Sequence, residues 1–214
     1  MAVTASDIAK LRAQTGAGMM DCKQALEENG GDMEKAADYL RKKGMAKAAK
    51  RSGKVAAEGA VASYIHAGGK VGVLVEVNCE TDFVARTESF QAVVKDIAMH
   101  IAASAPKYIS RSEVSAVELE KEKDVYREQL KNEGKPADMI EKIVEGKMGK
   151  YYSEVCLLEQ AFIKDEEKTI ETLLAEKVGE IGEKITIRRF ARYELGEGIE
   201  KTATDFVSEV QSQL

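Results

Sequence analysis

The chain has 214 residues, of which 44% are hydrophobic and 32% charged, and its formal net charge is −5 at pH 7. This length and composition suffice for one large or two small globular domains that bury their cores without disulfides or metals. No apolar run approaches the roughly 18 residues of a membrane span and no signal-peptide pattern opens the chain, so we expect a cytoplasmic protein without a membrane segment.

The cysteine and histidine content argues against a metal centre. Cys22, Cys79 and Cys156 are odd in number and show no C-x-x-C spacing, so neither a disulfide framework nor a zinc site is indicated. The two histidines add little ligating capacity. We therefore expect reduced, mostly buried thiols, no metal and no cofactor.

The first 54 residues predict a compact three-helix bundle of the ubiquitin-associated kind. Thr4 and Asp7 have the spacing of a capping box at the start of the first helix, which ends at a glycine loop at 15–18. A second helix follows this loop, and a third begins at Asp32. Met19 and Met20 lie in or just after this loop, where flexible side chains suit a binding surface. We expect the side chain of one of the two, but not both, to pack into the core of the bundle.

Residues 41–54 contain seven basic residues and no acidic one. The whole of 1–54 has 11 basic and 7 acidic residues, whereas the remainder has 21 and 30, so the basic excess is local. Such a segment suits either RNA contact or a solvated linker. The absence of interleaved aromatic residues favours a linker between domains 1–54 and 55–214.

Two alternating segments, 58–66 and 70–79, flank an Ala-Gly-Gly turn and predict a β-hairpin. With glycines 68 and 69 as the turn, the numbers of two paired residues add up to 137. Cys79 then faces Glu58, while His66 lies at the far end, about 26 Å away at ~3.3 Å per residue. This separation excludes a thiolate–imidazole pair, and the chain also lacks phosphate-loop, zincin and hydrolase-elbow motifs, so we expect no enzyme.

A corner at 81–86 joins the second strand to a helix whose apolar residues begin at Phe90, with Thr87 or Ser89 as its N-cap. Two interpretations of Phe83 and Val84 are open. The side chains pack under the corner as local core, or Phe83 is an exposed wedge that enters a partner's hydrophobic seam beside the carboxylate of Asp82.

The rest of the chain completes an α+β fold. A charged helix and an apolar return helix, separated by a break at 132–136, predict an antiparallel helical hairpin of the coiled-coil type at about 113–150. The apolar positions of the return helix include Met139. A helix around Ile170 precedes a strand at 185–193, which we expect to be the third strand of a small antiparallel sheet. The sequence TDFV of the corner occurs again at 204–207, where it includes Thr204 and Phe206. The helical spacing of the apolar residues there predicts an amphipathic terminal helix at about 203–213.

Several of these motifs together resemble the elongation factor Ts family, the nucleotide-exchange factors of the translation GTPase elongation factor Tu. Leu11 and Arg12 followed by TGAGMMDCK at 15–23 resemble the family's N-terminal signature, and VNCETDFVA at 77–85 its core signature. GKP at 134–136, VEG at 144–146 and GEGIEK at 196–201 resemble later segments. Nearly the whole chain is covered.

The resemblance implies a role for each part. Family members grip the GTPase domain with the small bundle, which implies partner contacts at Arg12, Met19, Met20 and Lys23. They insert the corner Thr81, Asp82, Phe83 and Val84 beside the magnesium and phosphate side of the nucleotide pocket. This promotes release of GDP without covalent chemistry, and the factor is displaced as GTP binds. His66 and Phe206 are implied as further contacts with elongation factor Tu.

The chain departs from longer members, which build the core from two similar halves, because it has a single hairpin-and-helix unit. Homodimerisation that supplies the missing half is therefore a hypothesis. Two alternatives come from other classes: an RNA-binding protein using 41–54, and an enzyme with a site near Cys79. We rank both below the exchange factor and expect no direct contact with nucleic acid.

Overall fold

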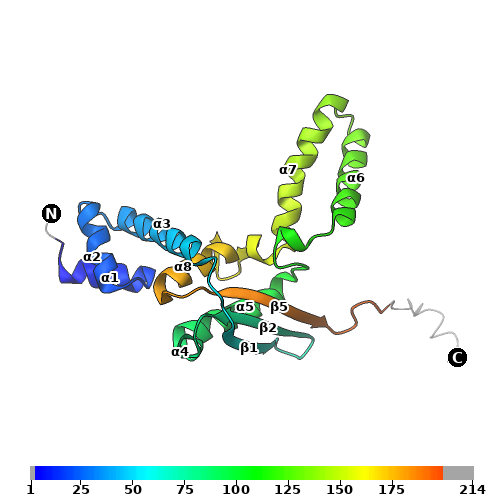
Figure 1. Ribbon diagram of the computed structural model, residues 1–214. Helices are drawn as coiled ribbons and strands as arrows, with labels where there is room; N and C mark the ends of the chain where they lie inside the picture. Colours follow the sequence, from blue (N-terminus) through cyan, green and yellow to red (C-terminus); the bar gives the residue numbers. More distant parts are fainter. Residues whose placement is uncertain (1–2, 200–214) are drawn as a thin grey trace, which may run out of the picture.

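The computed structural model describes residues 3–199 and contains a helical bundle, a small sheet covered by helices, and a projecting helical hairpin (Figure 1). The bundle and the hairpin extend in different directions from the sheet region. The sequence therefore predicted the α+β class and the order of these three parts. The terminal helix expected at 203–213, including Phe206, lies outside the described residues.

The bundle consists of α1 (Ala5–Thr15), α2 (Met19–Glu28) and α3 (Met33–Arg51). Thr4 caps α1 with the expected capping box, since its side chain accepts from Asp7 N and its own N–H donates to the Asp7 carboxylate. The buried side chains of the three helices form a small separate core. Its members are Leu11, Cys22, Ala25, Leu26, Ala36 and Leu40.

Helix α3 continues through most of the segment expected to be a solvated linker, and this expectation is wrong for residues 41–51. The reason is tertiary packing. Gly44 is buried in α3 and lies against Gly179 of α8 (Ile170–Ile181), and Ala48 packs against the main core, so the second half of α3 is held by the rest of the molecule.

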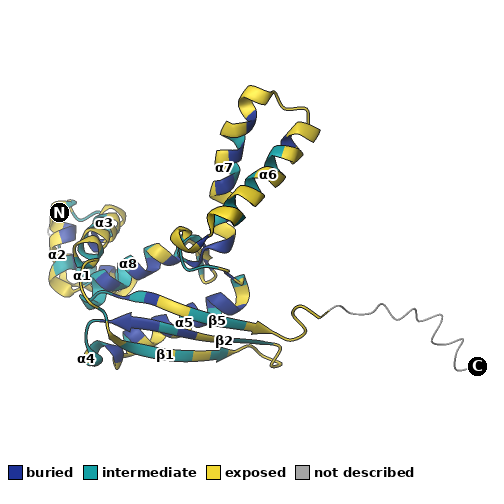
Figure 2. Cartoon of the chain, turned by 45° about the vertical axis from the view of Figure 1, so that its right-hand side comes forward, coloured by how far each residue is buried: buried dark blue, intermediate teal, exposed yellow. Residues whose placement is uncertain are grey.

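The sheet has the strand order β1 (Glu58–Ile65), β2 (Val71–Cys79) and β5 (Thr186–Glu194), all antiparallel. Glu58 pairs with Cys79, as the glycine turn predicted. Valines 73, 75 and 77 are buried on the inner face, against α5 (Glu88–Ser104) and α8. Figure 2 shows this buried layer between the sheet and the helices, with exposed residues covering most of the projecting hairpin.

The hairpin consists of α6 (Ala116–Asn132) and α7 (Ala137–Val155), so its return helix continues beyond the expected end near 150. It has its own core, which includes Leu130, Val144 and Met148. Arg127 of α6 pairs with Glu141 of α7 at 2.8 Å. Met139 is exposed, contrary to its expected place on the apolar face, because it lies in the first turn of α7 beside the connecting loop.

Two short strands between the hairpin and α8 were not predicted. β3 (Ala161–Phe162) and β4 (Asp165–Thr169) form a separate two-stranded ladder. They are too short and too polar to show an alternating pattern. Among residues 3–199, no helix is both long and apolar enough to cross a membrane.

Candidate functional site

The corner between β2 and α5 is a single helical turn, α4 (Asp82–Ala85), which the sequence indicated only as a loop. Thr81 is its N-cap, and its hydroxyl oxygen accepts from Val84 N at 3.4 Å. Thr87 then caps α5, accepting from Phe90 N at 3.3 Å. Two threonine caps therefore define the exit from the strand, the turn and the start of the next helix.

The two apolar residues of the turn have different environments. Phe83 is 78% exposed, so its interpretation as local core is wrong. Val84 packs against the main hydrophobic core, as that interpretation expected, and Ala85 is buried. The turn therefore directs one aromatic ring outward from a buried base. Asp82 beside it pairs with the exposed Arg86 at 2.9 Å, a contact that a partner's groups can readily replace.

The backbone of the corner is held by Glu183, which follows α8. One carboxylate oxygen, Oε2, accepts from Glu80 N at 3.1 Å and from Thr81 N at 3.0 Å, and Oε1 accepts from the Thr81 hydroxyl at 2.7 Å. Hydrogen bonds to an ionised acceptor are stronger than neutral ones. Three of them converge on two consecutive residues, so the start of the turn has little freedom.

Glu80 forms a second brace with the segment after α8 and with the bundle. It accepts from Lys184 N at 2.7 Å and from the Arg51 guanidinium at 2.8 Å, and these two contacts lower the pKa of its carboxyl group. The Lys184 ammonium in turn donates to the carbonyls of Ser52 and Lys54 after the end of α3. The end of α3, the corner and the entry to β5 are thus tied together.

Cys79 lies beneath the corner and does not have the surroundings of a nucleophile. It is fully buried, donates from Sγ to Thr81 O at 3.2 Å, and has a thiol pKa raised by burial. His66 follows the far end of β1, where its Nδ1 lies 3.2 Å from the Tyr64 hydroxyl. The strand register keeps His66 and Cys79 at opposite ends of the hairpin, so these two residues cannot form a thiolate–imidazole pair.

A second candidate surface lies on the bundle, where Arg12, Met19, Met20 and Lys23 are all exposed. The exposed fractions of Met19 and Met20 are 55% and 75%, so the expectation that one of them fills the bundle is wrong. Both begin α2 after a loop in which Gly16 has φ +68, a left-handed conformation that favours glycine.

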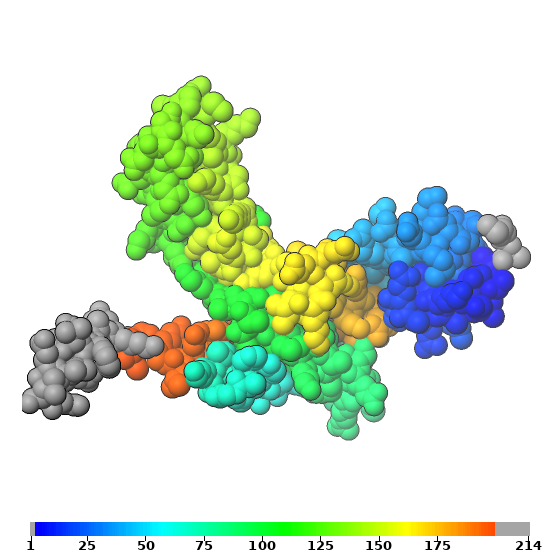
Figure 3. Space-filling model, turned by 180° about the vertical axis from the view of Figure 1, so that it is seen from behind, coloured from blue at the N-terminus to red at the C-terminus, as the bar shows by residue number. Residues whose placement is uncertain are grey.

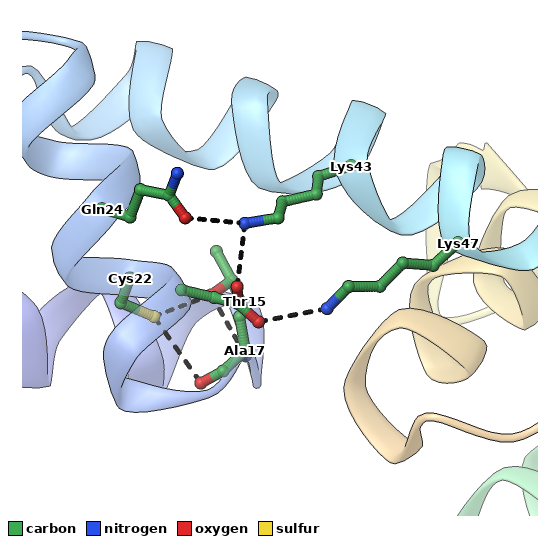
Figure 4. Close-up of polar contacts among 7 residues, drawn as sticks. Thr15, Ala17, Cys22, Gln24, Lys43 and Lys47 are labelled. Carbon is green, nitrogen blue, oxygen red and sulfur yellow. Dashed lines mark hydrogen bonds and ion pairs between the residues drawn. The ribbon is translucent and has the colours of Figure 1, made fainter.

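Asp21 fixes the start of α2 to α3. Its carboxylate accepts from Lys43 at 2.9 Å and from Lys47 at 3.1 Å, and the Lys43 contact is the main cause of its lowered pKa. Figure 4 shows both lysines extending from the same helix toward the loop around Thr15 and Ala17. The two methionines are therefore presented from a braced turn.

The same pairing weakens the RNA-binding interpretation of residues 41–54. Four of the seven basic side chains in this segment pair with acidic groups of the chain itself: Arg41 with Asp38, Lys43 and Lys47 with Asp21, and Arg51 with Glu80. Each such contact reduces the positive field available to phosphate groups.

The corner and the bundle lie at the same end of the sheet, while the turn after β1 and the end of β5 lie at the other (Figures 1 and 3). The structure thus brings the corner residues and the bundle residues to one side of the molecule. It does not bring His66 to them. The bracing residues Glu80, Glu183 and Arg51 were missed by sequence reasoning, because their contacts join positions far apart in the chain.

Comparison with known proteins gives consistent results. The family model described as Elongation factor TS matches residues 4–197. The chain is 62% identical over 210 residues to a Geobacter metallireducens protein named Elongation factor Ts, covering 98% of this chain and 97% of that protein. It is similar to proteins of the same name from Desulforamulus reducens and Desulfitobacterium hafniense, at 58% and 56% identity over 212 residues, with 99% of this chain and 98% of each relative covered.

Proposed function

The chain belongs to the elongation factor Ts family of translation factors, and from this premise we propose that it binds elongation factor Tu carrying GDP and accelerates release of the nucleotide. The observation that carries this proposal is the exposed ring of Phe83 on a corner whose backbone Glu183 and Glu80 brace. The ring of Phe83 can displace groups of a partner only if the backbone of the corner stays rigid. The proposed activity implies a cytoplasmic location and no covalent chemistry.

The proposed mechanism is negative coupling between two ligands of the same GTPase. The corner, Thr81 to Val84, enters beside the magnesium and phosphate side of the nucleotide pocket, with Phe83 in an apolar seam and Asp82 exchanging Arg86 for groups of the partner. The bundle residues Arg12, Met19, Met20 and Lys23 hold the GTPase domain. Linkage requires that the factor and GDP weaken each other's binding equally, and a ~10⁴-fold effect corresponds to about 5.5 kcal/mol. GTP displaces the factor in the same way.

The proposal is tested by stopped-flow release of a fluorescent GDP analogue from elongation factor Tu. We expect strong acceleration by the native chain. Phe83→Ala should reduce the acceleration at least about 30-fold, equivalent to the ~2 kcal/mol of an interface hot spot. Val117→Ala is the matched control, because Val117 is a similarly exposed apolar residue, at 81%, on α6. No acceleration by the folded native chain would overturn the proposal.

We also propose that a second copy of the chain covers the outer face of the sheet. Within residues 3–199, this face exposes a group of apolar side chains between its centre and the end remote from the corner: Ile65, Leu74, Tyr193 and Leu195. Several of them line a shallow hollow of about 470 Å³. Contiguous exposed apolar residues indicate an interaction surface. The other end is charged, with Glu76 held between Arg188 and Arg189, which lower its pKa to about 2.

A further inference from the structure

Helices α3 and α8 cross at two glycines, and this crossing joins the bundle to the rest of the molecule. A Cβ atom added at Gly179 would lie 2.8 Å from the Cα of Gly44, closer than side-chain carbons approach a backbone atom. A Cβ atom added at Gly44 would instead lie 3.6 Å from Ala175 O, an ordinary contact distance. The two helices therefore approach as closely as their backbones permit, and only Gly179 is required for this.

The residue after Gly179 contacts segments next to both candidate surfaces. Glu180 Oε1 accepts from the hydroxyl of Ser89, in the first turn of α5 directly after the corner, at 2.8 Å. Its other oxygen, Oε2, accepts from Lys177 at 2.6 Å and lies against Gly16, where an added Cβ would be 2.8 Å away. Gly16 belongs to the loop that leads to Met19 and Met20. One carboxylate thus lies between the bundle loop and α5, the helix that directly follows the corner.

Helix α3 provides a parallel connection. Lys43 and Lys47 hold Asp21 at the start of α2, and Arg51 on the same helix pairs with Glu80 at the corner. Movement of α3 relative to α8 would therefore change the separation between the methionine pair and the aromatic ring.

We infer that the α3–α8 crossing is a positioning joint, in which Gly179 and Glu180 hold Met19 and Met20 at a fixed separation from Phe83 so that one GTPase molecule contacts both. This inference rests on the proposed function. When two contacts are carried on one rigid frame, the second forms at a high effective concentration once the first has formed. A displaced bundle loses this advantage even though each contact residue is intact.

The test compares Gly179→Ala with Gly44→Ala in the GDP-release assay on the full chain. Both substitutions exchange a helical glycine for alanine and so change helix propensity equally. Gly179→Ala should raise the half-saturating concentration about tenfold or more, while the maximal rate at saturation stays within about twofold. Gly44→Ala should leave both quantities within about twofold of the native values, since its Cβ meets no close contact. Equal behaviour of the two variants would overturn the joint.

A second readout separates positioning from general damage. Met20→Ala should raise the half-saturating concentration of the native chain about fivefold or more, and should add nothing further in the Gly179→Ala background, because the displaced bundle no longer contributes. A loss of folded protein would instead raise the half-saturating concentration only in proportion to the unfolded fraction seen by circular dichroism and would leave the Met20→Ala effect unchanged, and this result would contradict the inference.

If circular dichroism shows that Gly179→Ala does not fold, Glu180→Ala decides the question. It should raise the half-saturating concentration, and Glu180→Gln should restore it by keeping an acceptor for Ser89. If the half-saturating concentration of Glu180→Ala equals that of the native chain, the inference of a positioning joint is overturned. Absence of acceleration by the native chain contradicts the proposed function and removes the premise of the joint, whereas normal acceleration with indistinguishable glycine variants contradicts the joint alone.

Discussion

The hydroxyl of Thr81 donates to Glu183 Oε1 at 2.7 Å, joining two residues that lie 102 positions apart in the chain. Glu183 follows Gly182, the left-handed cap of α8, and precedes β5, so its position depends on the end of a helix and the start of a strand. The corner that carries Phe83 is therefore supported by the loop between α8 and β5, the strand that pairs with β2.

Replacing Glu183 with alanine should loosen the corner without touching its exposed face. The backbone N–H groups of Glu80 and Thr81 lose their acceptor, and a partly buried unpaired donor costs about 1–3 kcal/mol. We expect a loss of this size in the free energy of unfolding, measured by urea denaturation. The maximal rate of GDP release should also fall, because the corner no longer holds the ring of Phe83 in a fixed position.

Glu183→Gln is the matched control for this change. Its amide oxygen can still accept from the two N–H groups, and its amide nitrogen can donate to the Thr81 hydroxyl, so most of the stability and rate should return. An unchanged release rate in Glu183→Ala would show that rigidity of the corner is not needed.

Stability should fall in mild acid because of His100. The ring is fully buried, Nε2 lies 3.0 Å from Gln160 Oε1, and Nδ1 accepts from Ile163 N at 3.3 Å, so the neutral form is the one accommodated. Burial lowers its pKa in the folded protein below the ordinary 6.5. The unfolded chain then binds the proton more readily, so stability is complete above about pH 6.5 and decreases below it, by at most about 1.4 kcal/mol per pH unit.

Urea denaturation between pH 5 and pH 7 measures this slope, and His100→Phe should abolish it despite lowering stability at every pH. The exposed His66 is the chain's other histidine, so His66→Phe is the control and should keep the slope. Identical slopes in the two variants would rule out His100 as the source.

Placing a charge on the outer face of the sheet should prevent the proposed homodimer. Leu74 is half exposed at the centre of this face, between Ser63 and Ala191 on the neighbouring strands. Leu74→Lys should shift the sedimentation coefficient from dimer to monomer, because an unpaired ammonium group would be buried between the two copies. Val117→Lys on the hairpin should have no effect. A native chain that sediments as a monomer at high concentration would contradict the proposal.

The sequence predicted best the features that depend on neighbours along the chain. The glycine turn at 68 and 69 determined the pairing of Glu58 with Cys79, because a two-residue turn leaves one register. Thr4, Thr81 and Thr87 all act as N-caps; Thr4 was predicted from its capping-box spacing with Asp7, and Thr87 was one of two candidates, with Ser89, for the start of α5.

Features that depend on distant contacts were missed. Residues 41–51 are mostly lysine, arginine and alanine, which favour a helix, but they lack the regular apolar spacing of a buried face, and the contacts of Gly44 and Ala48 show where this part of α3 packs. Glu183 is one acidic residue among many, and no local pattern indicates that it accepts from the backbone of the corner. Periodicity also left the position of Phe83 open, whereas the structure shows that it is exposed.

The most direct test of the account measures the affinity of the chain for elongation factor Tu with and without saturating GDP, for the native protein and for Phe83→Ala. The native chain should bind the nucleotide-free GTPase up to ~10⁴-fold more tightly than the GDP-bound form. In Phe83→Ala this ratio should shrink at least about 30-fold, while contacts of the bundle preserve binding to the GDP-bound form. The same ratio in both proteins would contradict the assignment of Phe83 as the residue that couples binding of the factor to release of GDP.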